Sequence, residues 1–416
     1  MNPGLVVKLR PTGPWRIGPD SGARNRVDVV YHSDSLYSAI SIAMARLGRL
    51  EAWLDATARS AAPAVWFSSC FPFVEETGFV APPRTVWPPV APALMAAHVR
   101  WKSARFIPLS MVQSVLAGAP LDENRWSVDG ASGCLMPAGV PGPFRTAVRW
   151  NAAIDRLSGA SERHSIACIE FRPGAGLWTV AAFAGEAARD TWQDTVKAAF
   201  RLLADSGFGG ERSRGWGRSE APEFIEGELP GMILGEAPPV PAPAPEPPAV
   251  SETGDPGRDL EGASAPEAPP VLEATPAPEE PLADAFGSDS EPAPWIEATP
   301  APEEVPAPAP APEPPPAAPP TGPGTPHWLL SLFSPAPADA VDWSRGNYVA
   351  LARAGRVESP AGSGELKKQV RMIAEGSVIV AESAPRGAAP DVAPDGFAHP
   401  VFRAGFALAI PLPEGH

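Results

Sequence analysis

A proline-rich, acidic segment at residues 237–326 most constrains what this chain can fold into. Proline has no backbone N–H and a fixed φ, so proline at every second or third position excludes both a helix and a central strand. The segment also holds few bulky apolar side chains with which to form a core. We therefore expect a disordered linker, partly in the polyproline II conformation, between two ordered parts of the chain.

The charge of the chain is concentrated in this linker. The whole chain has a formal net charge of −15, and the linker, with sixteen acidic residues and the single base Arg258, accounts for all of it. The octapeptide EATPAPEE occurs in it twice, at 273–280 and at 297–304, which is too few copies for a solenoid. The ordered parts therefore sum to zero charge, so we do not expect strong non-specific binding of nucleic acid by the isolated chain.

The cysteines and the hydropathy of the sequence indicate the cellular compartment of the protein. Cys70, Cys134 and Cys168 are far apart and form no C-x-x-C pair, which favours buried, reduced thiols. The chain has neither a long apolar run nor a basic N-terminus followed by an apolar stretch. We expect a cytoplasmic protein without membrane contact.

Residues 1–236 form the first predicted domain. Alternating apolar residues predict strands at 4–10, 64–74, 165–171, 177–183 and 216–225, with a hairpin turn at 173–176. Apolar stripes of helical period predict helices at 34–47 and 191–206, the first with Ser33 as N-cap and Asp34 in its first turn. We interpret this as the β-α-β-β-α-β order of a ferredoxin-like domain.

An insertion at 81–163 interrupts this domain and is too long for a simple loop. We expect a subdomain or a projecting arm. It interleaves basic and aromatic residues, a mixture that suits single-stranded nucleic acid because cations bind phosphate and rings stack on bases. These residues are His98, Arg100, Trp101, Lys102, Arg105, Phe106, Arg145, Arg149, Trp150 and Arg156.

The glycine-rich loop at 207–217 (sequence GFGGERSRGWG, followed by Arg218) is the most informative motif. Glycine permits positive φ and leaves backbone N–H groups open to a ligand, and arginine offers a fork of donors that fits phosphate. It lacks the G-K-[ST] of a Walker A loop, and it follows a helix, unlike a dinucleotide fingerprint. The alternative is a glycine C-cap followed by an ordinary turn. We predict phosphate binding by Gly207, Gly209, Gly210, Arg212, Ser213, Arg214, Gly215, Gly217 and Arg218.

Residues 327–416 form the second, smaller predicted domain. Strands are predicted at 327–333, 348–357, 370–380 and 406–412, with little helix between them. We expect this sheet domain to pack against the first domain.

Six motifs in register carry a family resemblance. They are the opening strand, 32–40 (HSDSLYSAI), 154–156 (IDR), the glycine-rich loop, 374–378 (AEGSV) and 400–405 (PVFRAG). Together they resemble subunit four of the type III-A CRISPR (Csm) interference complex, a family of the RAMP superfamily. The resemblance implies an α+β fold with two ferredoxin-like, RRM-like domains, and it leaves the linker uncovered.

The resemblance also implies a function. The chain would be a non-catalytic subunit that caps the 5′ handle of the guide RNA and joins the large polymerase-like subunit to the backbone RAMP subunits. The glycine-rich loop, His32, Ser33 and Arg156 would contact the RNA, and the insertion would correspond to a thumb that bends the guide. Target RNA would be read by base pairing, and neither a cofactor nor a metal is implied.

Three alternatives remain open at this stage. A related RAMP branch of guide-processing endoribonucleases uses an early histidine as general acid or base, which would give His32 a catalytic role. The chain could equally be the handle-capping subunit of a type III-B complex, or a scaffold without RNA contact. Among single residues, helix capping is the favoured role for Asp34, and a solvated surface is favoured for Lys367 and Lys368.

Overall fold

The computed structural model describes residues 2–19, 23–88, 101–119, 121–154, 160–235, 324–359 and 362–413. The predicted linker lies outside these ranges, except for its last residues, where β12 (Thr325–Leu329) begins. The second ordered part therefore starts slightly earlier than predicted. Met1–Pro239 and Ala317–His416 belong to one compact unit.

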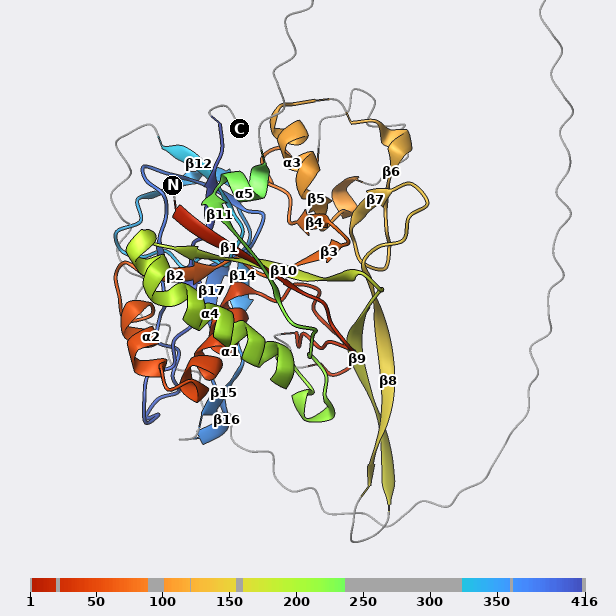
Figure 1. The fold of residues 1–416 in the computed structure, drawn as a ribbon, viewed down its shortest axis with the longest axis vertical. Coiled ribbons are helices and arrows are strands. Elements are labelled where there is room, and N and C mark those ends of the chain that lie inside the picture. Colours follow the sequence, from red (N-terminus) through yellow and green to blue (C-terminus); the bar gives the residue numbers. More distant parts are fainter. Residues whose placement is uncertain are drawn as a thin grey trace, which may run out of the picture. The chain divides into compact units, whose positions relative to one another are not determined.

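A seven-stranded antiparallel sheet organises the N-terminal part of this unit (Figure 1). Its strands follow the order β11-β1-β10-β3-β4-β5, and β2 and β3 pair with opposite ends of β10. The strands are β1 (Asn2–Leu9), β2 (Val65–Phe67), β3 (Phe71–Val74), β4 (Thr77–Val80), β5 (Ile107–Pro108), β10 (Ala175–Phe183) and β11 (Glu223–Leu229). The predicted single strand at 64–74 is thus two strands, β2 and β3.

The predicted hairpin between 165–171 and 177–183 is wrong. All nine residues of β10 are buried, and its two edges are occupied by β1 on one side and by β2 and β3 on the other. No edge remains for the preceding strand, β9 (Ser161–Phe171), which pairs instead with β8 (Phe144–Ile154) in a sheet of their own. Because β9 is not part of the main sheet, the main elements follow one another along the chain as β1, α1, the pair β2 and β3, β10, α4 and β11.

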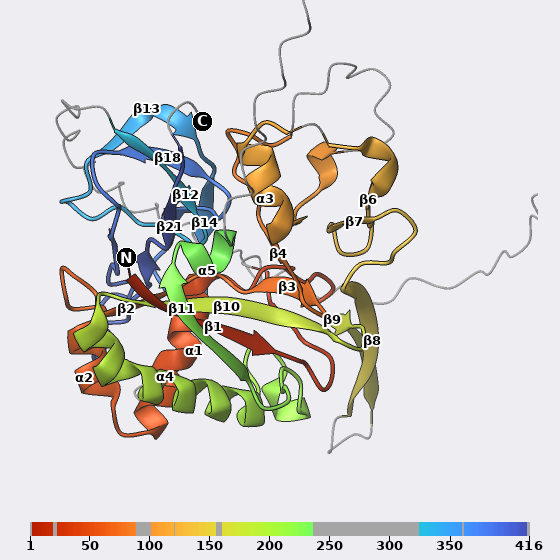
Figure 2. The same cartoon turned by 45° about the horizontal axis from the view of Figure 1, so that its top comes forward.

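Helices α1 (Ser33–Arg46) and α4 (Glu186–Ser206) lie side by side on one face of the sheet, next to α2 (Leu50–Ala56) (Figure 2). Their predicted apolar stripes are confirmed: Leu36 and Ile40 of α1 and Phe200 of α4 are fully buried. The N-cap position of α1 is His32 rather than Ser33. The Ser33 hydroxyl instead accepts a hydrogen bond of 3.0 Å from the Leu332 N–H, so the C-terminal part of the chain uses it.

The last strand of this sheet begins later than predicted. The loop after α4 folds back on the N-terminal segment, because the Gly217 N–H donates to the Pro14 carbonyl at 3.0 Å. Trp216 therefore lies in the loop, and β11 pairs with β1 only from Glu223 onward. The short helix α5 (Gly231–Leu234) follows β11.

The insertion contains both an arm and a small group of elements. The arm is the β8–β9 hairpin, which extends away from the main sheet in Figures 1 and 2. The other elements are η1 (Trp101–Ser103), β5, α3 (Leu109–Leu116), η2 (Glu123–Arg125), β6 (Trp126–Val128) and β7 (Leu135–Pro137). Arg156, which follows β8 in the sequence, lies outside the described residues, as do His98 and Arg100.

The C-terminal part forms a four-stranded sheet of order β13-β18-β12-β21, with three two-stranded pairs beside it. Its further strands are β13 (Val341–Asn347), β14 (Ala350–Arg353), β15 (Arg356–Ser359), β16 (Gly362–Leu366), β17 (Val370–Ile373), β18 (Val378–Ala381), β19 (Gly387–Ala388), β20 (Gly405–Phe406) and β21 (Ala409–Pro411). The expected packing against the N-terminal part is confirmed. Trp328 and Phe406 share one buried apolar cluster with Leu36, and the Ser69 N–H donates to the Leu330 carbonyl at 2.8 Å.

Candidate nucleic-acid interface

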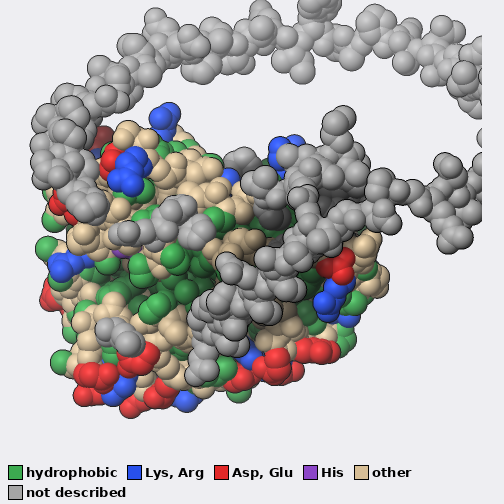
Figure 3. All heavy atoms as spheres, turned by 90° about the horizontal axis from the view of Figure 1, so that it is seen from above, with side chains coloured by type: hydrophobic (Ala, Val, Ile, Leu, Met, Phe, Trp, Pro, Cys, Tyr) green, Lys and Arg blue, Asp and Glu red, His purple; other side chains and the backbone are tan. Residues whose placement is uncertain are grey.

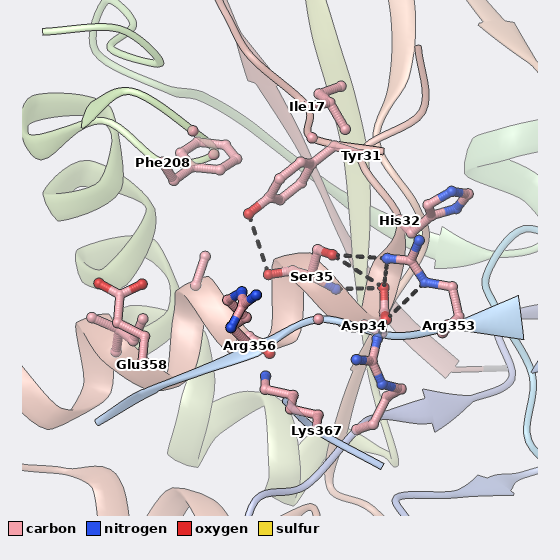
Figure 4. A pocket seen from close by; sticks show the side chains of 18 of the residues that line it. Ile17, Tyr31, His32, Asp34, Ser35, Phe208, Arg353, Arg356, Glu358 and Lys367 are labelled. Carbon is pink, nitrogen blue, oxygen red and sulfur yellow. Dashed lines mark hydrogen bonds and ion pairs between the residues drawn. The ribbon is translucent and has the colours of Figure 1, made fainter. Parts of the chain in front are cut away.

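A pocket of about 720 Å³ lies where the start of α1, the glycine-rich loop and the C-terminal strands meet (Figure 4). Six of its lining residues are arginine or lysine and two are carboxylates. This excess of cations suits a ligand that carries phosphate. The charged lining residues are His32, Asp34, Arg46, Arg212, Arg353, Arg356, Glu358, Lys367 and Arg403.

Charges elsewhere on the surface are mixed. On the face shown in Figure 3, acidic and basic side chains occur together near the edges, and apolar side chains occupy much of the middle. Several exposed cations have acidic neighbours, as Arg59 has Glu51 and Asp55. The lining of the pocket, with its excess of cations, therefore differs from the mixed charges on this face.

The pocket brings the two predicted RNA-binding segments together. Of the predicted site residues, it is lined by His32, Gly209, Gly210 and Arg212. The remaining predicted residues in the described part of the chain do not line it, namely Ser33, Gly207, Ser213, Arg214, Gly215, Gly217 and Arg218. The glycine-rich loop and the turn before α1 thus face a common space, although they are about 170 positions apart in the sequence.

Most glycines of the loop serve close packing of the backbone. A Cβ on Gly209 would lie 2.6 Å from the Arg16 carbonyl oxygen, and one on Gly217 would lie 2.1 Å from that of Phe208. The N–H groups of Gly210 and Gly217 donate to the carbonyls of Arg16 and Pro14. The predicted mechanism, open backbone N–H groups for a phosphate, is therefore wrong at Gly210 and Gly217. Gly207 does end α4 with a positive φ of 76°, as predicted.

Asp34 is the centre of a buried ion-pair cluster. Arg353 donates from Nη2 to Oδ1 at 3.0 Å and from Nε to Oδ2 at 3.1 Å, and Arg403 donates from Nη1 to Oδ2. Burial opposes the charge of Asp34, but the two guanidinium groups outweigh it and hold the pKa of the carboxyl well below its usual range. Asp34 also accepts the Ser35 N–H at 2.7 Å, so helix capping describes only part of its role.

His32 is buried between two carboxylates. It is only 7% exposed, its Nδ1 lies 2.8 Å from Glu375 Oε1, and its Nε2 lies 3.4 Å from Asp28 Oδ2. Burial by itself would lower the pKa of His32, but Glu375 and Asp28 outweigh burial and raise the pKa to about 10. The imidazole is therefore a cation at neutral pH, with no free lone pair to accept a proton.

The three arginines of the loop lie in different surroundings. Arg212 pairs with Glu358 of β15, and Arg214 Nε lies 3.2 Å from Glu211 Oε2. The Arg218 side chain is exposed and makes no hydrogen bond or ion pair with another described residue. Exposed pairs of this kind contribute little stability, so a phosphate can replace the carboxylate of Glu358 or Glu211 at small cost.

The cations on the C-terminal side of the pocket were not predicted as site residues. They are Arg353, Arg356, Lys367 and Arg403. Arg403 lies in the 400–405 motif, but no spacing rule connects that motif with Asp34. The surface prediction is correct for Lys368, which pairs with Asp395 at 2.8 Å, and wrong for Lys367, which lines the pocket. Successive side chains of an extended segment leave on opposite sides, so two adjacent lysines can have different surroundings.

The β8–β9 arm carries part of the predicted basic and aromatic mixture. Trp150 is 67% exposed, and the Arg163 guanidinium lies 5.6 Å from the centre of its ring. Arg149 pairs with Glu170, on the neighbouring strand. Trp101 and Phe106 are buried instead, so they belong to the core and are not free to stack on a base.

Cys70, Cys134 and Cys168 are buried free thiols, as predicted, and burial raises the pKa of the Cys134 thiol to about 12. Within the described ranges, no group of three or more His, Cys, Asp or Glu side chains is arranged to hold a metal ion. The helices in the part of the chain that the structure describes are too short or too polar to span a membrane.

The C-terminal side of the pocket matches a known family. A family model described as the CRISPR Csm4 C-terminal domain matches residues 323–412. This part of the chain is similar to the Csm4 C-terminal domain. The match includes Arg353, Arg356, Lys367 and Arg403, the unpredicted cations of the pocket. The predicted resemblance to subunit four of the type III-A Csm complex is confirmed.

Solved structures show a related fold. A chain in the crystal structure of the Csm3–Csm4 subcomplex of the type III-A CRISPR-Cas interference complex aligns with a TM-score of 0.52 at 12% identity, over 99% of both chains. Two crystal structures of a Csm1–Csm4 cassette, with cA4 and with pppApA, align at 16% identity with TM-scores of 0.47 and 0.46, each over 99% of this chain and 100% of the other. No curated protein matches this chain. The chain therefore has a mixed α/β fold of mostly antiparallel sheets, as Csm4 has.

Proposed function

We propose that this chain is a non-catalytic, RNA-binding subunit of a type III-A CRISPR effector complex, which acts in defence against viruses and plasmids. It caps the 5′ handle of the guide RNA. The observation that carries the proposal is the cationic pocket, in which the glycine-rich loop and the turn before α1 meet cations of the Csm4 C-terminal domain. Arginine and lysine side chains on one concave surface are the groups that bind an RNA backbone.

The proposed partners follow from the family. The solved Csm4 proteins are found with Csm3 in one complex and with Csm1 in another. By this relation, the chain joins the large polymerase-like subunit to the backbone RAMP subunits, in the cytoplasm, with target RNA bound only through the guide. No cofactor takes part in this role.

The proposed architecture is a pair of ferredoxin-like RAMP domains at 1–236 and 327–416, with a thumb-like insertion at 81–163 and a disordered linker between the domains. The neighbour order β11-β1-β10-β3 supports the first domain, because a ferredoxin-like sheet places its fourth, first, third and second strands side by side. The exposed Trp150 of the β8–β9 arm supports a thumb that touches RNA.

The proposed RNA contacts are those named from the sequence, with Arg156 in the arm, His32 and Ser33 at the turn, and the glycine-rich loop. Arg212 and Arg218 are the best placed of them, since one lines the pocket and the other is exposed. Ribonuclease activity through His32 is the less supported alternative. Glu375 and Asp28 raise the pKa of His32, and its Nδ1 lies 2.8 Å from Glu375 Oε1, which disfavours the role of a base that accepts a 2′-OH proton.

Crosslinking of guide RNA in the co-expressed complex tests the proposal. We expect the wild-type chain to crosslink to the 5′ handle, and the Arg212→Ala, Arg214→Ala, Arg218→Ala triple variant to crosslink several-fold less, because its phosphate contacts are lost. The matched control removes three arginines outside the pocket lining, Arg59 after α2 and Arg189 and Arg201 in α4, and should crosslink like the wild type.

Three results would contradict this function. Equal crosslinking by the loop variant and the control would show that the glycine-rich loop does not hold the RNA. Cleavage of unprocessed repeat RNA by the purified chain, abolished by His32→Ala, would identify a ribonuclease. Co-purification with the large subunit of a type III-B complex would instead assign the chain to that type.

A further inference from the structure

The C-terminal side of the pocket holds donors and a cation that lack partners. Lys367 is half-buried, and its side chain makes no hydrogen bond or ion pair with another described residue. Arg403 is 7% exposed, and its Nε is buried without a hydrogen-bond partner, although its Nη1 and Nη2 are bonded to Asp34 and to the Ala354 carbonyl. Buried donors of charged groups are normally satisfied, so the Arg403 Nε points to a missing acceptor. The Lys367 ammonium, which lines the same pocket, is available to bind that acceptor too.

Among the described residues that line the pocket, cations outnumber carboxylates. The single carboxylate of Asp34 is shared by Arg353 and Arg403, and the other carboxylate of the pocket, Glu358, is paired with Arg212. Lys367 makes no ion pair with a described carboxylate, so it adds a further positive charge beside this cluster. Burial, with the nearby Arg403 guanidinium, lowers the pKa of Lys367 accordingly. An anion bound there would remove this cost.

The backbone of the β15–β16 hairpin fixes two of these cations, Arg356 and Lys367, relative to each other. Arg356 begins β15 and pairs with Leu366 at the end of β16, and the Lys367 N–H donates to the Gly355 carbonyl at 2.9 Å. Figure 4 shows the side chains of Arg356 and Lys367 reaching into the same part of the pocket. Arg356 Nη1 bonds to the Gly364 carbonyl, which orients its guanidinium. The hairpin thus presents two cations on a fixed support.

We propose that Lys367, Arg356 and the Nε of Arg403 form a subsite for one phosphate group of the bound RNA, on the side of the pocket opposite the glycine-rich loop. A phosphodiester has two non-bridging oxygens that share one negative charge, enough to accept from the Lys367 ammonium and from one guanidinium together. The assignment of the phosphate to RNA rests on the proposed function, whereas the anion site itself does not. The RNA strand then lies between the two sides of the pocket, with phosphates held by cations from both parts of the chain.

Guide RNAs that each carry one uncharged methylphosphonate in the handle test the subsite in the reconstituted complex. We expect one position at which the substitution weakens RNA retention by roughly 3- to 10-fold in the wild type. In Lys367→Gln the same position should have no further effect, because the contact is already lost. Lys368→Gln, the adjacent surface lysine, should behave like the wild type, and Lys367→Arg should largely restore the position-specific effect. An unchanged methylphosphonate pattern in Lys367→Gln would overturn the proposal.

Inorganic phosphate provides a test that does not depend on RNA. We expect phosphate, compared with chloride at equal ionic strength, to raise the melting temperature of the full-length wild type and of Lys368→Gln, and to raise that of Lys367→Gln less. Equal shifts in all three proteins would overturn the anion site.

A loss of the phosphate effect in Lys367→Gln together with an unchanged methylphosphonate pattern would show that the site takes a free phosphate and would refute its assignment to RNA. If handle crosslinking fails while the phosphate effect depends on Lys367, the proposed function is wrong and the anion site stands.

Discussion

The charged residues beside the pocket owe their positions to pairs formed across long sequence distances. Asp34 meets Arg353 and Arg403, which lie 319 and 369 positions later, and His32 meets Glu375. Each of these groups is buried, so removing one partner would leave a charge without compensation. At the scale of residues, the pairs fix the orientation of the turn before α1 against the C-terminal strands.

The His32–Glu375 pair gives a prediction for the pH dependence of stability. The pKa of His32 is raised in the folded chain from its ordinary 6.5 to about 10. A raised pKa means that the stabilisation is complete below about pH 6.5 and is lost as the pH rises toward 10. We expect His32→Gln to be less stable than the wild type at neutral pH, with a difference that shrinks toward pH 10.

Urea unfolding of both proteins over this pH range measures the difference. His399→Gln, a change at an exposed histidine, serves as the control and should follow the wild-type curve. A constant difference between His32→Gln and the wild type at every pH would show that the charge of His32 does not contribute.

At the scale of elements, helices were predictable and strand pairings were not. The apolar stripes of α1 and α4 depend on residues three and four positions apart, so the sequence displays them directly. The pairing of β8 with β9, and of β10 with β1, depends on which edges are free in the finished sheet. The glycine-rich loop was predicted from its glycines and arginines. In the structure, most of these glycines pack closely against backbone atoms.

Two glycines of the loop allow the cost of backbone strain to be measured apart from the cost of a steric clash. Gly215 and Gly217 have φ of 80° and 76°, but a Cβ on Gly215 would meet no atom within 4 Å, whereas one on Gly217 would meet the Phe208 carbonyl oxygen at 2.1 Å. We expect Gly215→Ala to lower the free energy of unfolding by about 1 kcal/mol through its positive φ. Gly217→Ala should lower it by at least about 1 kcal/mol more, since the Phe208 carbonyl belongs to the backbone and cannot move aside.

Chemical denaturation of Gly215→Ala and Gly217→Ala, compared with the wild type, measures both losses in the free energy of unfolding. Similar losses would mean that the loop can shift to accept a side chain at Gly217, and that its close packing with Phe208 is not required.

At the scale of the whole molecule, the two parts of the chain share one core. Trp328, Leu330 and Phe406 belong to the same buried cluster as residues of α1 and β2, and the ring of Tyr37 meets that of Phe406 edge-on at 5.8 Å. Burial of this apolar surface is the main force that holds the parts together, and the ion pairs fix their register.

Expression of residues 1–239 and 317–416 as two separate polypeptides tests this shared core. We expect them to co-purify, because Trp328, Leu330 and Phe406 of the second are buried in one apolar cluster with residues of the first. Asp34→Asn in the first polypeptide should reduce the yield of the second, since two buried arginines lose their partner, and Asp55→Asn at an exposed pair should not. Recovery of each polypeptide alone as a stable folded protein would contradict the shared core.

The sequence by itself showed the two main helices, the resemblance to Csm4 and the motif at 207–217, because each depends on residues close together in the chain. It did not reveal Arg353, Arg356, Lys367 and Arg403 as neighbours of that motif. Their position depends on the packing of two parts separated by the linker, and on which side of a strand each side chain leaves. Only the tertiary structure decided that the glycine-rich loop and the C-terminal cations face one pocket, because contacts at this sequence distance are fixed by the shared core.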